Sequence, residues 1–176
     1  YQLGGGGVDN LMSQATAVGP NSVLDIANAN TITGTNNVMV SAHGSAGAAV
    51  VFDDTQNFTG TLTVTGNLNA STISPTNYPS AGNNQYNLAA PYLAFATLTL
   101  AGGTDGTLPN VTAVNLDPMG TLNIIDTVQN VDHIPSSTPI NFYGGALGFL
   151  NDGSSANFAE TFETVNLLAG DSEIFS

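Results

Sequence analysis

Threonine alternates with large aliphatic residues in several short stretches, and this pattern constrains the fold more than any other feature of the chain. The stretches 61–65 (TLTVT) and 97–100 (TLTL) are the clearest cases. Successive side chains of an extended strand point to opposite faces, so a period of two places the aliphatic residues on one face and threonine on the other. Threonine suits strands, and turns rich in Gly, Asn and Asp separate the stretches. The sequence therefore predicts an all-β fold built from short strands.

Short strands of this kind are predicted along the whole chain, at residues 22–26, 37–42, 48–52, 61–65, 92–100, 111–116, 121–125, 146–150, 164–168 and 173–175. Helix is expected only as a turn or two, at 11–18 and 155–163, because neither stretch sustains a period of 3.6 residues. Residues 75–91 are rich in Pro, Asn, Ser, Gly and Tyr, which predicts a long loop projecting from the body. We therefore expect a single domain over residues 1–176 with an irregular loop insertion around 75–91.

Weak internal repetition favours a stack of coils. A Val-Asn-Leu strand, a Gly-bearing turn and a second short strand occur twice, beginning at Val114 and at Val165, 51 residues apart. That separation equals two coils if one coil takes roughly 20–29 residues. Gly-Thr-Leu segments at Gly60 and Gly120 suggest the same repeat. A parallel β-helix is the first expectation, with hydrogen-bonded asparagine ladders between its coils. A β-sandwich or jelly roll stays the alternative, because its strands recur every ~8–12 residues.

The charge balance excludes several partners. The chain has no Lys and no Arg, and 13 acidic residues give a formal net charge of −13. Such a charge disfavours binding to nucleic acid and to anionic lipid. The charge is expected to serve solubility, while calcium is the one cofactor that could offset the repulsion through oxygen ligands. No apolar run approaches the ~20 residues of a spanning helix, so no membrane insertion is expected.

Neither the lack of cysteine nor the first residues of the chain argue against an extracellular location. The chain contains no cysteine, which does not argue for the cytosol, because a repetitive core does not depend on disulfides. It begins at Tyr1 without the basic and apolar segments of a signal peptide. An export signal is therefore expected upstream or already removed.

Adjacent carboxylates raise the question of sugar hydrolysis. His43-Gly44 and Asp53-Asp54 resemble two short signatures of polygalacturonase-type β-helix enzymes, but their order is reversed and the basic strand of those enzymes is missing. Glycoside hydrolysis requires two carboxyl groups at a set separation, whereas neighbouring residues of a strand point to opposite faces. Lyase-type and esterase-type β-helices rely on arginine, which this chain lacks. We therefore assign no catalytic residue and expect Asp53 and Asp54 in a turn or on the surface.

Histidine and aspartate are the candidate metal ligands. His43 lies in a small-residue turn and His133 follows Asp132, so each histidine is expected to be solvated or locally hydrogen-bonded. A metal site requires further ligands, and Asp126, Asp132 and His133 are the set that could converge. Nothing in the spacing indicates that they do, and no metal ligand is assigned.

Other polar motifs favour structural roles. Asp105 and Asp152 lie in Gly-bearing turns without the spacing of an EF-hand or of a calcium-binding roll, so turn formation is expected. The glycine run 4–7 is followed by no Gly-Lys-Ser/Thr and is not a phosphate loop. Asn-x-Ser/Thr sequons, which chance predicts in a chain so rich in Asn and Thr, begin at Asn57, Asn69 and Asn110.

Three stretches resemble a known repeat family. Residues 1–7 (YQLGGGG), 57–72 (NFTGTLTVTGNLNAST) and above all 140–174 are similar to the autotransporter-associated β-strand repeats of large bacterial surface proteins, including those of planctomycetes. The likeness covers about half of the chain, and each motif is of low complexity. Two features depart from it, since those repeats carry some Lys or Arg and have no counterpart of 75–91. The resemblance implies a right-handed parallel β-helix, an extracellular stalk or passenger, and no catalytic residues or cofactor.

We therefore expect a non-enzymatic structural or adhesive segment of a secreted cell-surface protein, or a subunit of a self-assembling extracellular filament. Its expected partners are further copies of itself, neighbouring repeats of the same protein, or surface glycans. Two alternatives stay open. One is a carbohydrate-binding module that stacks sugars on Tyr78, Tyr86 and Tyr92, and the other is a polysaccharide hydrolase that uses Asp53 and Asp54.

Overall fold

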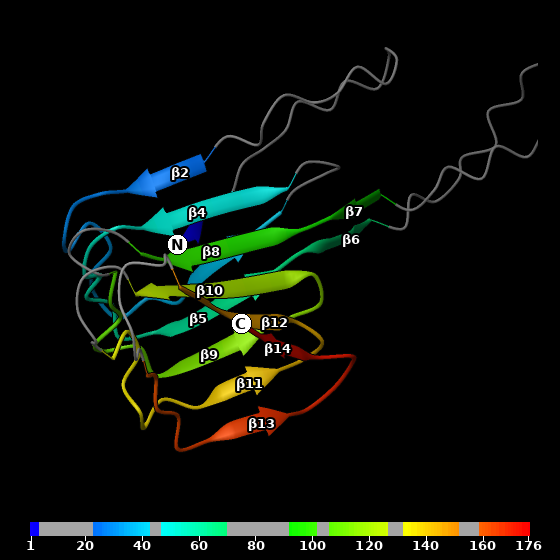
Figure 1. Ribbon diagram of the computed structural model, residues 1–176. Helices are drawn as coiled ribbons and strands as arrows, with labels where there is room; N and C mark the ends of the chain where they lie inside the picture. The colour runs from blue at the N-terminus through cyan, green and yellow to red at the C-terminus, as the bar shows by residue number, and fades with distance from the viewer. Residues whose placement is uncertain (4–22, 43–46, 70–91, 102–105, 127–131, 152–158) are drawn as a thin grey trace, which may run out of the picture.

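The computed structural model describes residues 1–3, 23–42, 47–69, 92–101, 106–126, 132–151 and 159–176 (Figure 1). These residues form strands and turns and contain no helix. Of the two predicted helical turns, 11–18 lies outside the described residues, and 159–163 of the second is not helical. No helix long and apolar enough to cross a membrane occurs in this part of the chain.

Two 6-stranded sheets carry the fold, and consecutive strands alternate between them. One, here called the odd sheet, contains in spatial order β1 (Gln2–Leu3), β3 (Val38–Ser41), β5 (Thr61–Thr65), β9 (Ala113–Leu116), β11 (Ile140–Phe142) and β13 (Val165–Leu167). The other, the even sheet, contains β2 (Val23–Ile26), β4 (Ala48–Phe52), β8 (Ala96–Leu100), β10 (Gly120–Asp126), β12 (Ala146–Asn151) and β14 (Glu173–Phe175).

Every pairing within these two sheets is parallel, so each coil of the chain adds one strand to each sheet and the next coil stacks on it. This arrangement is a parallel β-solenoid, and the predicted β-helix is confirmed. The alternative β-sandwich or jelly roll is wrong, because those folds are built from antiparallel sheets. The right-handed sense of the coil stays a prediction.

The strand register confirms one of the two repeats read from the sequence. Val114 pairs with Ile140, which pairs with Val165, so the two Val-Asn-Leu strands are two coils apart. The repeat read from Gly60 and Gly120 is wrong, because Gly60 precedes β5 of the odd sheet and Gly120 opens β10 of the even sheet. The two glycines share a physical constraint instead. A Cβ would lie 2.3 Å from a carbonyl oxygen of the preceding coil at Gly60 and 2.1 Å from one at Gly120.

The core lies between the sheets, where inward-facing residues stack on their register partners. One column of the even sheet contains Val50, Leu98, Leu122 and Leu147, each at most 1% exposed. Buried and half-buried residues alternate along β5 and β8, as the threonine pattern predicts. Each fully buried aliphatic side chain stabilises the fold by about 1.5–3 kcal/mol relative to exposure.

A third side of the coil is formed by the longer turns that lead from each even strand to the next odd strand. Phe58, Leu108 and Ile134 are fully buried in it. Backbone hydrogen bonds join successive turns, from Gln56 N to Thr107 O (2.9 Å) and from Leu108 N to His133 O (2.7 Å). The third side is therefore stacked in the same way as the sheets.

One excursion leaves the coil between β5 and β8. It begins and ends with the antiparallel pair β6 (Asn67–Asn69) and β7 (Tyr92–Ala94), which projects from the stack (Figure 1). The predicted strand 92–100 is therefore two strands, because Phe95 lies at the junction of this hairpin with the coil. The predicted loop 75–91 lies outside the described residues.

Candidate functional site

Asparagine side chains on the third side form a ladder across three coils. Nδ2 of Asn57 donates to Oδ1 of Asn30 (2.6 Å), and Nδ2 of Asn110 donates to Oδ1 of Asn57 (2.8 Å). Beside this ladder the hydroxyls of Thr55 and Thr107 lie 2.8 Å apart. Two of the predicted sequons, at Asn57 and Asn110, are therefore rungs of one ladder.

A second ladder follows the odd sheet. Asn141 donates from Nδ2 to Oδ1 of Asn115 (2.9 Å), and Asn166 donates in the same way to Asn141 (2.8 Å). Each amide that both donates and accepts polarises its neighbours, so a chain of such bonds is stronger than isolated pairs. The asparagine ladders expected between coils are confirmed.

Gln56 joins two coils inside the third side. Its side chain is fully buried, and Oε1 accepts a hydrogen bond from Ile32 N at 2.9 Å. Its Nε2 donates to the carbonyl oxygens of Asn28 (2.9 Å) and Asp54 (3.0 Å). The amide thereby gives the buried Ile32 N an acceptor that it would otherwise lack.

A buried histidine and a buried glutamate meet on the turns that follow β10 and β12. His133 is fully buried and Glu160 is 2% exposed at its side chain. Oε1 of Glu160 lies 2.7 Å from Nδ1 of His133 and accepts a second hydrogen bond from His133 N at 2.6 Å. Oε2 of Glu160 is buried and accepts no hydrogen bond from the described residues. The pair fastens the turn of one coil to that of the next.

Asp132 and His133, two of the three residues considered as metal ligands with Asp126, do not point to one site. Asp132 is exposed, while His133 turns inward to Glu160. Asp126 ends β10, and its side chain lies outside the described part. The described residues contain no group of three or more His, Cys, Asp or Glu side chains that could hold a metal ion.

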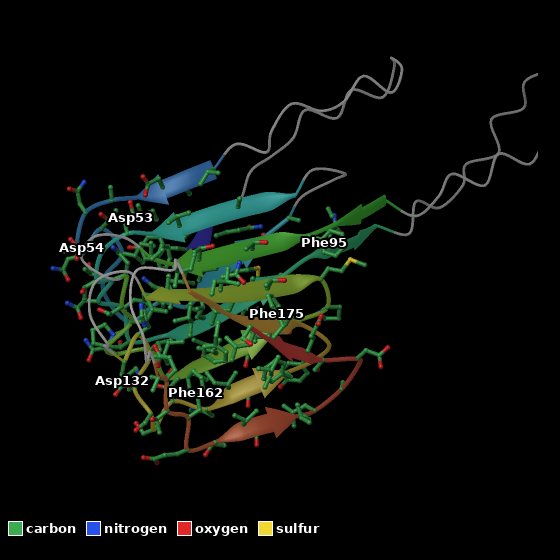
Figure 2. The ribbon with its side chains drawn as sticks, in the orientation of Figure 1. Asp53, Asp54, Phe95, Asp132, Phe162 and Phe175 are labelled. Carbon is green, nitrogen blue, oxygen red and sulfur yellow. The ribbon has the colours of Figure 1, made fainter. Side chains whose placement is uncertain are left out.

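The aspartates considered for hydrolysis lie where β4 ends, at the start of the third side (Figure 2). Oδ1 of Asp54 accepts a hydrogen bond from Thr55 N at 2.7 Å, which fixes it in a turn. Asp53 shares a side-chain hydrogen bond with Asp25 of the preceding coil. Burial, then the charge of Asp25 and this hydrogen bond, raise the pKa of Asp53 above its ordinary value of 3.8. The two adjacent aspartates therefore have separate local partners.

Several predicted positions lie outside the described residues: His43, Asp105, Asp152, the glycine run 4–7, Tyr78 and Tyr86. Asn69 and Tyr92 belong to the β6–β7 hairpin, but their side chains are not described. Glu160 and Gln56, which the sequence did not single out, add polar contacts to the third side. Glu160 bonds to His133 of the neighbouring coil, and Gln56 bonds to Asn28 and Ile32 of the preceding coil as well as to the nearby Asp54. No local motif signals the contacts between coils.

Comparison with models of protein families, with curated proteins and with solved structures finds no match for this chain. The arrangement of the described residues is therefore the basis for inferring a function. The described residues contain two asparagine ladders, the buried Gln56 and the buried His133–Glu160 pair. The coil formed by β13 and β14, here called the outermost coil, has exposed aliphatic residues.

Proposed function

We propose that this chain is a non-enzymatic structural segment of a secreted cell-surface protein, a rigid scaffold of stacked coils. One observation carries the proposal. The same kinds of side chain occupy the same register positions on successive coils. Aliphatic residues face the core, and Asn or Thr residues line up from one coil to the next outside it. Repetition of this kind adds length and stiffness with each coil and distributes its polar groups along ladders.

The chemistry of the polar groups supports the same role. The ladder asparagines, Gln56, Asp54 and the His133–Glu160 pair all hold neighbouring segments of this chain. A chain without Lys or Arg also has no trypsin cleavage site, an advantage outside the cell. The likeness to autotransporter-associated repeats points to a stalk or passenger that works beside neighbouring repeats of the same protein.

Location is the first test. Gold-labelled antibodies raised against the chain are expected to label intact producing cells as strongly as permeabilised cells. Labelling that requires permeabilisation would contradict a surface scaffold.

The second test is for hydrolase activity, with polygalacturonate and other acidic polysaccharides as substrates. The chain is expected to release no reducing ends from them. Release that Asp53→Asn abolishes and Asp171→Asn leaves intact would establish a hydrolase instead. Asp171 is the matched control, because it is an exposed aspartate of the outermost coil.

A further inference from the structure

The turn that joins β9 to β10 contains the only Asp-Pro bond of the chain, between Asp117 and Pro118 (Figure 1). Gly120 N donates a hydrogen bond to Asp117 O at 2.9 Å, and Met119 has a φ of 61°. These are the features of a type II turn, which favours proline at its second position and requires a positive φ at its third, where glycine is usual. Met119 is therefore strained, because its Cβ disfavours the left-handed region.

The preceding coil holds the turn in this conformation. Asp117 N donates to Val64 O at 3.0 Å, and Pro118 O accepts a hydrogen bond from Gly66 N at 3.0 Å. Met119 also packs closely on Gly66, where an added Cβ would lie 2.3 Å from Cβ of Met119. A strained residue persists where the surrounding structure fixes it in this way, and such residues cluster at reactive sites. The turn therefore stores strain next to the Asp-Pro bond.

Water and acid both reach this bond. Pro118 is exposed and Asp117 is half-buried. Burial raises the pKa of Asp117 above its ordinary value of 3.8. In mildly acidic solution, a larger share of the Asp117 side chain is therefore in the carboxylic acid form than for an ordinary aspartate. This form carries both a nucleophilic oxygen and a proton.

Three groups act on the backbone carbonyl group of Asp117. The side-chain carboxyl oxygen of the same residue reaches the carbonyl carbon by closing a five-membered ring, so no bimolecular encounter is required. The N–H of Gly120 donates to the carbonyl oxygen and stabilises the negative charge that develops there. The leaving group is the tertiary nitrogen of Pro118, which accepts a proton more readily than the nitrogen of a secondary amide.

We propose that the folded chain cuts itself between Asp117 and Pro118 in mildly acidic solution, with water as the only co-reactant. In the first step, the carboxyl oxygen of Asp117 bonds to its own backbone carbonyl carbon. The carboxyl proton passes to the Pro118 nitrogen, and the bond between that carbon and that nitrogen breaks. In the second step, water opens the cyclic anhydride left at Asp117 and yields two carboxyl groups. The net reaction is the hydrolysis of one peptide bond, without any oxidation or reduction.

The cut is expected to leave both fragments in the stack. Residues 1–117 contain β8 and β9, and residues 118–176 contain their neighbours β10 and β11. The pairings of β8 with β10 and of β9 with β11 do not depend on the broken bond, so non-covalent contacts hold the second fragment. Each chain cuts itself once and turns over no substrate. This activity goes beyond the proposed scaffold function and does not depend on it.

The test incubates the 176-residue chain in buffers from neutral to mildly acidic pH, followed by denaturing electrophoresis and mass spectrometry. Folded wild type is expected to give fragments 1–117 and 118–176, whose summed mass exceeds that of the intact chain by one water. The rate should rise as the pH falls and should not depend on protein concentration. The fragments should co-elute in gel filtration without denaturant. The chain unfolded in urea should be cut at least about 10-fold more slowly, because it lacks the turn hydrogen bond and the strain.

Four variants separate the contributions to the reaction. Asp117→Asn removes the carboxylic acid and is expected to abolish the cut, whereas Asp171→Asn, at an exposed aspartate elsewhere, should leave it intact. Pro118→Ala replaces the tertiary nitrogen by a secondary one and should slow the cut strongly. Met119→Gly keeps the turn but relieves the strain, so it should slow the cut several-fold. Circular dichroism verifies that each variant retains its β-sheet content.

Four results would overturn the proposal. The first is a folded wild type that stays intact throughout the pH series, and the second is a folded chain that is cut no faster than the unfolded chain. The third is a cut that survives Asp117→Asn. The fourth is a rate proportional to protein concentration, which would indicate cutting of one molecule by another.

Discussion

Asn110 donates a hydrogen bond from Nδ2 to Oδ1 of Asn57 at 2.8 Å, although the two residues are 53 positions apart in the chain. Other asparagines that meet across one coil boundary are 25 to 27 positions apart. The additional length lies in the excursion that begins at β6 and ends at β7. The stack therefore continues across an insertion as long as a whole coil, and the ladder preserves the register on both sides of it.

The ladders are expected to contribute to stability according to the number of bonds each rung makes. Asn141→Ala removes two interstrand hydrogen bonds and should lower the free energy of unfolding by about 1–3 kcal/mol. Asn166→Ala removes one bond at the outermost coil and should cost less. Urea unfolding followed by circular dichroism measures both values. Equal losses would contradict a contribution that depends on the number of bonds, and no loss from either variant would mean that the ladder has no energetic role.

Gln56 is expected to be among the most sensitive polar residues of the described fold. Gln56→Leu fits a similar volume but leaves Ile32 N without its acceptor and Asp54 O without the Gln56 donor, whereas Asn28 O keeps the hydrogen bond from Thr31 Oγ1. Each buried group left unpaired costs about 1–3 kcal/mol, so a loss of at least about 2 kcal/mol is expected in urea unfolding. Gln2→Leu is the control, because Gln2 is exposed and makes one side-chain bond, to Ser41. A loss no larger than that of the control would show that Gln56 does not hold the two coils together.

Removal of Glu160 should destabilise the turns that follow β10 and β12. Glu160→Ala takes away the acceptor of both His133 Nδ1 and His133 N and leaves a fully buried imidazole. A buried donor that loses its acceptor costs about 1–3 kcal/mol, so a clear loss of stability is expected. Glu160→Gln keeps an acceptor oxygen in place and is expected to lose less. Thermal unfolding of the two variants measures the difference, and a Glu160→Ala protein as stable as wild type would contradict the importance of this pair.

Stability is expected to rise as the solution is acidified toward the ordinary pKa of Asp53. Burial and the neighbouring Asp25 raise the pKa of Asp53 above 3.8, so the folded protein holds this proton more tightly than the unfolded chain. The resulting stabilisation is complete below about pH 3.8 and is lost as the pH rises through the raised pKa of the folded protein.

Asp53→Asn tests this pH dependence, because the amide cannot ionise. The variant is expected to be more stable than wild type at neutral pH and to show a flatter dependence of the unfolding free energy on pH. Asp171→Asn, which removes one exposed carboxylate far along the chain from Asp53, is the control for the loss of a single negative charge. A variant with the slope of wild type would mean that other carboxylates produce the effect.

Sequence patterns predicted the strands well wherever alternation was long enough to read. The predicted bounds 48–52, 61–65 and 173–175 are those of β4, β5 and β14. The strands β1, β6 and β11 were missed, because two or three residues are too few to show a period of two. The equally short β14 was predicted as the second strand of the Val-Asn-Leu repeat. The contacts of Gln56 and Glu160 could not be predicted either. They depend on which coils are neighbours, and an excursion of arbitrary length changes that without any local signal.

Cross-linking across the excursion tests the central claim, that successive coils stack in register, most directly. The chain has no cysteine, and Thr63 is the register partner of Asn115. Adjacent parallel strands lie about 4.8 Å apart, within the Cα separations of about 4.4–6.8 Å that disulfides span. The double variant Thr63→Cys/Asn115→Cys is therefore expected to form an intramolecular disulfide on mild oxidation, visible as a mobility shift that reductant reverses. Thr63→Cys/Asn141→Cys, one coil further along, should remain reduced. A disulfide in the second variant and none in the first would contradict the stacked-coil account.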